Sequence, residues 1–302
     1  MNQMVFVFIL LLIVIALDVL ALYGLRRHSR ESEEQMHALE WSLRRELHAE
    51  RAKSEQLLRE TRQQKESNNE FFMLMSHELR TPLHALSNYL AFLREDLQSG
   101  NVETALRQHS AVEKHGWKLQ RLVEQIELLA QIESSRDNWQ MAPLSLSLLV
   151  ANEAVASRSV ADERGIGFEW VHDGKELWVR GNEALLVLML RNLMENAIAA
   201  CRAGQKIGVA LNEQPGATVL TVRDTGVGLS PDEIAKLFQP FGKTASSIAA
   251  SRDGSGLGLY LCRLIAELHG GTIQAASRGH GSGTAFTVEL PRFLPETPEG
   301  QE

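Results

Sequence analysis

The 302-residue chain has few cysteines, no excess of positive charge and one long hydrophobic run. Cys201 and Cys262 lie in predicted helices, and their spacing fits neither a disulfide framework nor a metal site, so we expect two ordinary thiols. The formal net charge of −7 gives no reason to expect nucleic acid as a partner, because such binding needs a basic surface.

The hydrophobic run lies at the N-terminus. Residues 4–17 are apolar without a break and the run resumes over 19–25, which is long enough to span a bilayer. No basic side chain precedes it, so the pattern favours a retained single-pass anchor over a removable signal peptide. Arg26, Arg27 and Arg30 follow directly, which predicts that the C-terminal side lies in the cytoplasm.

Asp18 interrupts this run, and a carboxyl group inside a span is costly. Two interpretations stay open: a contact with another membrane protein or a dimer mate, or displacement toward the interface by a tilted helix. Residues 29–69 are rich in Glu, Arg and Gln, with apolar residues at partly helical spacing. This pattern predicts a helical, weakly coiled-coil linker that is too short and polar for a domain with its own core.

The string Ser-His-Glu-Leu-Arg-Thr-Pro-Leu at 76–83 places a histidine beside a carboxylate within a helical pattern. Apolar residues recur around it every three or four positions, at Phe72, Met75, Leu79, Leu83, Leu86, Leu90, Leu93 and Leu97. His77 lies two positions from the nearest of them, so at about 100° per residue it points about 200° away, toward solvent. An exposed helix histidine is ordinarily only a solvated side chain. This string, however, resembles the H-box of sensor histidine kinases, in which the histidine receives the γ-phosphate of ATP.

Asn192 and Asn196 lie in an apolar helix predicted from about 183, and their spacing of four residues places both on one face. Amide oxygens are neutral, hard ligands that suit Mg²⁺, which keeps several waters and bridges phosphates. The string 192–197 resembles the N-box of the ATPase fold that histidine kinases share with gyrase. The resemblance implies that Asn196 is the Mg²⁺ ligand and that Asn192 lies beside the phosphates of ATP.

Asp224-Thr-Gly-Val-Gly follows an alternating, strand-like stretch over 218–222. A strand that ends in this string offers a carboxylate acceptor, followed by backbone at Gly226 and Gly228 that is free to approach a ligand. The string resembles the G1 box of the same family. The resemblance implies that Asp224 accepts the exocyclic amine of adenine.

Three further strings follow in the order that the family has. Residues 238–241, beginning at Phe238, resemble the F-box; residues 254–259 resemble the G2 box; and residues 281–286, with Thr284, fit the last glycine-rich box. The G2 box opens a predicted helix whose N-terminal N–H groups could cradle phosphates. Its expected ATP-binding residues are Gly254, Gly256, Leu257 and Gly258. The resemblance covers about residues 70–291.

Residues 242–253 are small and polar, which is typical of a mobile lid over a nucleotide. Lys243, which we include among the ATP-binding candidates, and Arg252 either neutralise phosphate charge or are solvated loop cations. The family often has a basic residue where this chain has Ala199. Arg202, about one turn further on, either substitutes for it or that contact is missing.

The gyrase-type relatives hydrolyse ATP with a glutamate at the position of Asn192, and an amide is no useful base near neutral pH. The resemblance therefore implies attack of His77 on the γ-phosphate, while Glu78 orients the imidazole and takes or stabilises its proton. In family members with His-Glu-x-x-Thr, the threonine helps to dephosphorylate the partner. Thr81 thus favours a kinase that is also a phosphatase, the alternative being an ordinary helix residue before Pro82.

A second helix carries apolar residues at heptad-like spacing, namely Val112, Leu119, Leu122, Ile126, Leu129 and Ile132, after a turn at 98–101. Such a hairpin buries itself poorly alone, so two copies are expected to form a four-helix bundle in a homodimer. Further helices near 146–164, 183–203 and 258–269 interleave with strands near 167–172, 177–180, 206–211, 218–222, 272–276 and 285–290. This order predicts an α/β sandwich with helices on one face of a mixed sheet, and an α+β chain as a whole.

The expected organisation has five parts: an anchor over 1–25, a helical linker over 26–66, a dimerisation and histidine phosphotransfer domain over 67–136, a catalytic ATP-binding domain over 143–292, and a tail over 293–302. The resemblance implies a homodimeric histidine kinase of the bacterial inner membrane that uses ATP and Mg²⁺. Its expected partners are the receiver domain of a separate response regulator and a membrane sensor protein. A phosphatase-dominant enzyme and an ATP-gated scaffold are the alternatives, and intact His77, Asn196, Asp224 and Gly256 argue against the scaffold.

Overall fold

A computed structural model describes residues 2–134, 139–242 and 255–295, with only part of the side chains before residue 68. The chain divides into two compact units, Met1–Glu70 and Phe71–Glu302. Within the described residues, no helical segment combines the length and the hydropathy needed to cross a membrane. For nearly all residues of the anchor predicted over 1–25, the side chains lie outside the described part of the structure.

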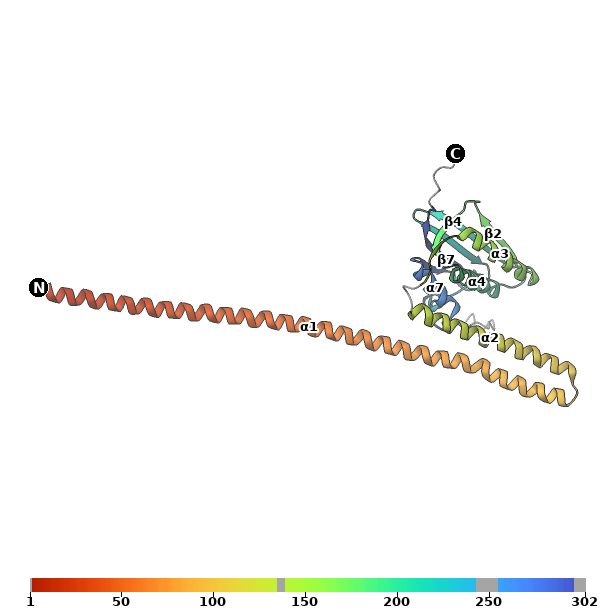
Figure 1. Ribbon diagram of the computed structural model, residues 1–302, viewed down its shortest axis with the longest axis horizontal. Helices are drawn as coiled ribbons and strands as arrows, with labels where there is room; N and C mark the ends of the chain where they lie inside the picture. Colours follow the sequence, from red (N-terminus) through yellow and green to blue (C-terminus); the bar gives the residue numbers. More distant parts are fainter. Residues whose placement is uncertain (1, 135–138, 243–254, 296–302) are drawn as a thin grey trace, which may run out of the picture. The chain divides into compact units, whose positions relative to one another are not determined.

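The part of α1 (Asn2–Gln98) that belongs to the second unit forms a hairpin with α2 (Val102–Ser134) (Figure 1). The chain reverses at the predicted turn, where Gly100 adopts a φ of +75°, and the Asn101 side chain accepts a hydrogen bond from the Thr104 N–H at 3.4 Å. Pro82 lies inside α1 without ending it. The turn predicted at 98–101 is thus confirmed.

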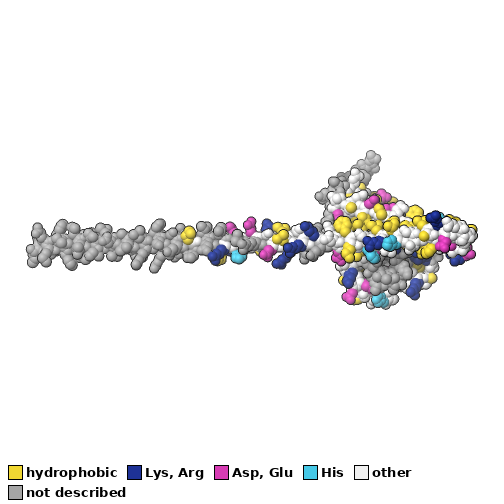
Figure 2. All heavy atoms as spheres, turned by 90° about the horizontal axis from the view of Figure 1, so that it is seen from below, with side chains coloured by type: hydrophobic (Ala, Val, Ile, Leu, Met, Phe, Trp, Pro, Cys, Tyr) yellow, Lys and Arg dark blue, Asp and Glu magenta, His cyan; other side chains and the backbone are white. Residues whose placement is uncertain are grey.

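The predicted apolar stripe of α1 consists of two rows of side chains, and within each row the residues are seven positions apart. Leu79, Leu86 and Leu93 are partly buried, whereas Leu83 and Leu90 are 52% and 51% exposed. A heptad repeat directs two rows of side chains inward only when a helix has neighbours on both sides, and here the single hairpin supplies one. The single hairpin thus leaves part of the stripe exposed, as expected of a hairpin that buries itself poorly alone. Figure 2 shows hydrophobic side chains along the hairpin surface.

The rest of the second unit is a sheet covered by helices. Its elements are β1 (Ala142–Ser145), α3 (Leu146–Glu163), β2 (Gly167–His172), β3 (Trp178–Gly181), α4 (Glu183–Ala200), β4 (Lys206–Gln214), β5 (Ala217–Asp224), α5 (Pro231–Lys236), α7 (Gly258–Leu268), β6 (Thr272–Ala276) and β7 (Ala285–Phe293). The described residues form a seven-stranded sheet of order β1-β3-β7-β5-β4-β2, in which β6 also pairs with β7. Only the β2–β4 pair among them is parallel.

One face of this sheet carries the core. Ile207, Val209 and Leu211 on β4 are buried and alternate with more exposed residues, which is the period of a strand with one covered face. Helices α3, α4 and α7 lie against that face (Figure 1), and Leu186 and Leu190 of α4 are fully buried. The predicted mixed sheet with helices on one face is confirmed.

The helices begin where the sequence supplies caps. The Ser145 hydroxyl accepts a hydrogen bond from the Leu148 N–H at the start of α3, and the Asn182 side chain accepts one from the Leu185 N–H at the start of α4. Helix α5 begins with a capping box in which Ser230 and the residue three positions later bond each other's backbone. This short helix and strand β1 were not expected from the sequence.

Candidate nucleotide-binding and phosphoacceptor sites

Asp224 is the last residue of β5 and is 2% exposed. Its Oδ1 atom accepts hydrogen bonds from the Gly226 N–H at 2.8 Å and from the Thr284 N–H at 3.3 Å. Thr284 is also buried and lies just before β7. Two backbone donors, one of them 60 residues further along the chain, therefore fix one buried carboxylate, and these bonds offset the cost of its burial.

The loops around this carboxylate approach one another too closely for any residue but glycine. A Cβ on Gly226 would lie 2.3 Å from the Ala200 carbonyl oxygen, and one on Gly283 would lie 1.9 Å from the Asp224 oxygen. A Cβ on Gly228, whose φ is +66°, would lie 2.1 Å from the oxygen of Gly279. The glycines therefore bring the loop backbones together around the end of β5.

Asn192 and Asn196 lie one turn apart on α4, the first 3% exposed and the second partly buried. A Cβ on Gly258, the first residue of α7, would lie 3.1 Å from the Asn192 Oδ1 atom. The amide of Asn192 thus faces the start of α7, where unpaired backbone N–H groups are suited to hold phosphate. Within the described part of the chain, the buried Asn192 Nδ2 atom has no hydrogen-bond partner.

The residues directly after α5 make aromatic contacts. The rings of Phe238 and Phe286 lie 6.5 Å apart in an edge-on arrangement. Phe241 has a φ of 56°, and a Cβ on Gly256 would lie 2.8 Å from it, so this turn also requires glycine. Leu257 is fully buried. The predicted ATP-binding residues Lys243 and Gly254 lie outside the described residues, as does most of the predicted lid.

The helical hairpin contacts this segment directly. A small core joins Leu122 of α2 to Phe241 and Leu257, and four residues of the hairpin pack against it: Phe71, Met75, Leu79 and Ile126. The ring centroids of Phe71 and Phe241 lie 5.5 Å apart. The hairpin residues that pack against Leu257 of the G2 box therefore include Met75 and Leu79, the stripe residues on either side of His77.

His77 lies on the opposite side of α1 from this stripe, and its side chain is 73% exposed, as the periodicity predicts. Its Nδ1 atom lies 3.7 Å from Oε1 of Glu78, whose side chain is only 13% exposed. The Thr81 hydroxyl donates a hydrogen bond to the His77 carbonyl at 3.1 Å. The three predicted phosphoacceptor-site residues are thus neighbours on one segment of helix.

Two family models match the chain. Residues 67–135 match the His Kinase A (phospho-acceptor) domain, and residues 181–293 match the Histidine kinase-, DNA gyrase B-, and HSP90-like ATPase. The chain belongs to the sensor histidine kinases. The enzyme type of that family is EC 2.7.13.3.

The curated relatives that match the chain are sensor proteins as well. Sensor protein SrrB of Staphylococcus aureus (strain MRSA252) is 27% identical over 225 residues, which are 74% of this chain and 38% of SrrB. The chain thus spans well under half the length of the curated relatives that it matches.

Solved structures support the fold. Histidine kinase ThkA in complex with response regulator protein TrrA is 22% identical, with a TM-score of 0.59 over 76% of this chain and 63% of that one. Acinetobacter baumannii histidine kinase AdeS is 22% identical, with a TM-score of 0.56 over 72% of this chain and 98% of that one. At these identities the two structures establish a shared fold only.

Two residues of this kinase that touch its nucleotide-binding domain were missed from the sequence. Arg121 of α2 donates a hydrogen bond from Nη2 to the Asn192 Oδ1 atom at 3.2 Å. Gln125, one turn further on, accepts a hydrogen bond from the Ser255 hydroxyl at 2.7 Å. Gln125 had a signal, because it is a polar residue three positions after Leu122 on an apolar stripe. Arg121 had none, because charged residues are common on exposed helix faces.

Neither cysteine of the kinase lies in a metal cluster within the described residues, where no group of three His, Cys, Asp or Glu side chains could hold an ion. Both cysteines are buried, and the Cys262 thiol donates to the Met189 carbonyl at 3.7 Å. Burial holds the pKa of the Cys262 thiol far above its ordinary value, so the group stays a neutral thiol.

Proposed function

We propose that the chain phosphorylates itself on His77 with ATP and Mg²⁺ and passes the phosphoryl group to an aspartate of a separate response regulator. The observation that carries the proposal is the fixed Asp224 carboxylate beside Gly226 and Thr284, on a domain that follows an exposed His77. A rigid carboxylate acceptor suits the exocyclic amine of adenine, and an exposed imidazole suits an acceptor that a mobile domain must reach. The complex of ThkA with TrrA supports a response regulator as the partner.

The residues present fit the nucleotide and the ion. The buried Asn192 amide faces the start of α7, where backbone N–H groups suit the phosphates of ATP. Asn196, on the same face of α4, offers a neutral amide oxygen that suits Mg²⁺. When bound, the ion would neutralise charge on the β- and γ-phosphates.

In the proposed reaction, a ring nitrogen of His77 attacks the γ-phosphorus in line, the bond to the β,γ-bridging oxygen breaks, and ADP leaves. The attacking nitrogen is the unprotonated one, and the proton on the other ring nitrogen, Nδ1, passes to Glu78, whose carboxylate lies 3.7 Å from it. Asn192 orients the phosphates but does not activate water, because an amide is not a base. The product is therefore a phosphohistidine and not free phosphate.

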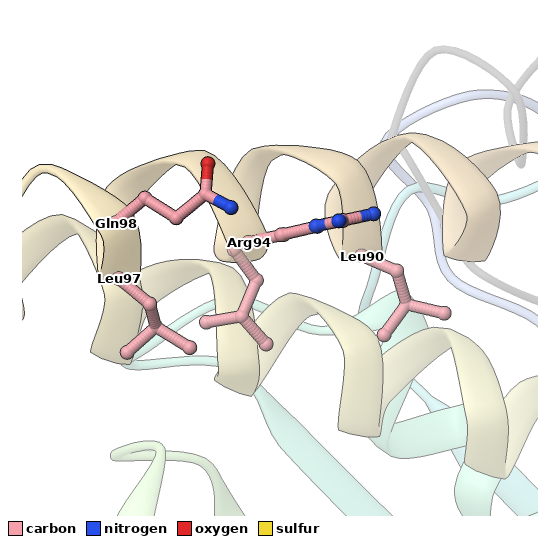
Figure 3. Close-up of a pocket in the computed structure, with 5 residues that line it drawn as sticks. Leu90, Arg94, Leu97 and Gln98 are labelled. Atoms are coloured by element: carbon pink, nitrogen blue, oxygen red, sulfur yellow. The ribbon is translucent and has the colours of Figure 1, made fainter.

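A homodimer and a membrane anchor belong to the same proposal. Leu83, Leu90 and Leu97 are exposed in the single chain, and a second hairpin packed on them would complete a four-helix bundle. A hollow on this surface is lined by Leu90, Leu93, Arg94, Leu97 and Gln98 (Figure 3), which is suited to receive side chains of the partner hairpin. The apolar run over 1–25 supports a membrane anchor at the cytoplasmic membrane, with the catalytic part in the cytoplasm.

The test is incubation of the full chain in lipid nanodiscs with Mg-ATP labelled at the γ-phosphate, beside the variants His77→Gln and His84→Gln. His84 is an exposed histidine on the same helix and serves as a matched control. We expect label that is stable to alkali and labile to acid on the wild type and on His84→Gln, and none on His77→Gln. Label on all three proteins, or on none of them despite bound ATP, would refute the proposal.

A second activity is favoured by Thr81, whose hydroxyl lies on the exposed helix surface one turn after His77. A hydroxyl at that place could hold a water against the phosphoaspartate of a docked regulator, so we propose that the kinase also dephosphorylates its partner. Slow autophosphorylation with fast dephosphorylation would identify a phosphatase-dominant enzyme. ATP binding without either reaction would identify a scaffold.

A further inference from the structure

Arg121 joins the helical hairpin to the proposed phosphate end of the nucleotide site. Its Nη2 atom donates to Oδ1 of Asn192 at 3.2 Å and also bonds Oε2 of Glu195, three residues further along α4. Both acceptors belong to the helix that carries the proposed Mg²⁺ ligand. The guanidinium is therefore held at this edge of the site by two contacts from one helix.

The surroundings of Arg121 distinguish it from an ordinary surface ion pair. An exposed ion pair contributes little by itself. Here one acceptor, Asn192, is 3% exposed, and its Nδ2 atom has no hydrogen-bond partner within the described residues. A buried amide that is half satisfied indicates a ligand at that place. A guanidinium has five N–H donors, so two contacts leave donors for a phosphate.

The packing of α2 keeps Arg121 at this place. Leu122, the next residue, packs against Phe241 and Leu257, and Gln125 is 6% exposed and bonds the Ser255 hydroxyl. The Gln125 Nε2 atom lies 4.0 Å from the Cβ position of Gly258. One face of α2 is thus packed on the start of α7, and Arg121 lies one turn before Gln125 on the same helix.

A cation beside Asn192 would offset the negative charge of Glu195 and of the phosphates of ATP. Glu195 is an acidic group beside Asn192, residues 197–200 of α4 are apolar, and Arg202 lies beyond the end of that helix. ATP adds further negative charge, and its terminal phosphate carries the largest share. Arg121 is a cation that already donates a hydrogen bond to the amide of Asn192.

We propose that Arg121 is an ATP-binding residue supplied by the hairpin, whose guanidinium contacts the terminal phosphate of the bound nucleotide while Glu195 positions it. The inference rests on the proposed function, since it takes ATP as the nucleotide. It implies that the nucleotide domain distinguishes ATP from ADP with a residue that it does not itself contain. Loss of the γ-phosphate then removes a bond between the hairpin and the nucleotide.

The test compares binding of Mg-ADP and of a non-hydrolysable ATP analogue with a β,γ-imido bridge, by calorimetry on the full chain in nanodiscs. The variant is Arg121→Gln, and the matched control is Arg107→Gln, because Arg107 is also on α2 and pairs with Glu103. We expect Arg121→Gln to weaken binding of the analogue about 10-fold and that of ADP less than about 2-fold, the effect of one charged phosphate contact. Arg107→Gln should change neither, and Glu195→Gln should weaken the analogue selectively but less.

The outcomes separate this inference from the proposed function. Equal losses of ADP and analogue affinity in Arg121→Gln would mean that Arg121 only stabilises domain docking, and the inference would be overturned. Unchanged or tighter binding of the analogue would overturn it as well. A wild type that binds the analogue but incorporates no label on His77 would refute the proposed kinase and leave the Arg121 comparison intact. A wild type that binds neither nucleotide would refute both.

Discussion

The Nδ1 atom of His77 and the Oε1 atom of Glu78 lie 3.7 Å apart, although the two residues are neighbours in sequence. Consecutive side chains on a helix diverge by about 100° and do not normally face each other. The two also differ in exposure, with the imidazole at 73% and the carboxylate at 13%. The imidazole can therefore be reached from solvent while the proposed proton acceptor, Glu78, is largely buried on the hairpin.

Glu78→Gln should keep ATP binding and reduce autophosphorylation about 100-fold, because an amide cannot take the imidazole proton. Initial rates of label incorporation at saturating Mg-ATP measure the effect, and nucleotide affinity serves as the control. A rate within a factor of two of the wild type would show that Glu78 has no part in proton transfer.

Thr81→Ala should slow dephosphorylation of the regulator about 10-fold, because the hydroxyl that would hold water is lost. Autophosphorylation should stay within about 2-fold, since the Thr81 hydroxyl bonds the His77 carbonyl of its own helix and alanine favours the helix. Thr81→Ser restores the hydroxyl and should restore dephosphorylation. Release of phosphate from purified phosphorylated regulator is the measurement. If both reactions fall together, Thr81 is a structural residue.

Gly226→Ala should abolish ATP binding and destabilise the domain by about 2 kcal/mol or more, because its Cβ would overlap the Ala200 backbone. Gly208→Ala is the matched control, since its Cβ would meet nothing within 4 Å on strand β4. That control should be neutral or more stable by about 0.5–1 kcal/mol. Urea unfolding and nucleotide titration of both variants check the pair. Retained ATP binding in Gly226→Ala would show that the loop can move aside.

Stability should fall as pH drops below about 6.5, the ordinary pKa of histidine, because of His269. Burial lowers the pKa of His269, and the bond from its Nδ1 to the Ile265 carbonyl only partly offsets this. Its Nε2 atom accepts the Asn182 N–H at 3.0 Å, so the folded state holds the ring neutral. The unfolded state therefore binds the proton first, and the stabilisation is fully present only above the unfolded pKa.

Urea unfolding at pH 7.5 and pH 5.5 measures this effect of His269. His269→Gln should lose less stability over that interval than the wild type, because it has no proton to bind. His109→Gln removes an exposed histidine on α2 and should follow the wild type. Equal pH dependence in His269→Gln and wild type would exclude His269 as the source.

Local patterns in the sequence were enough for the main elements and for the order of the sites. The heptad spacing on both sides of 98–101 predicted the hairpin, and β2 and β6 begin and end where alternation predicted. The ranges of α3 and α7 were within one residue of prediction. These features depend on neighbours within a few residues, which a sequence displays directly.

Elements that depend on distant partners were missed. Strand β1 has four residues, includes Pro143 and exists only because it pairs with β3 about 36 residues later. Helix α5 has six residues, which are too few to show a helical period of apolar residues. The Ser-Pro-Asp-Glu string at its start was nevertheless a recognisable capping-box signal. One hairpin covers only the row of the α1 stripe that faces α2, and the exposed row is the part for which the sequence predicted a second copy.

The sequence by itself determined which residues we propose to carry the chemistry, because His77, Asn192, Asn196 and Asp224 are set in strings with local spacing. Only the tertiary structure decided what surrounds them. It brought Thr284 to Asp224 across 60 residues, and Arg121 to Asn192 across 71. The reason is physical: Thr284 reaches Asp224 because β5 pairs with β7, and Arg121 reaches Asn192 because Leu122, Phe241 and Leu257 are buried in a shared core, and no single stretch of sequence contains either arrangement.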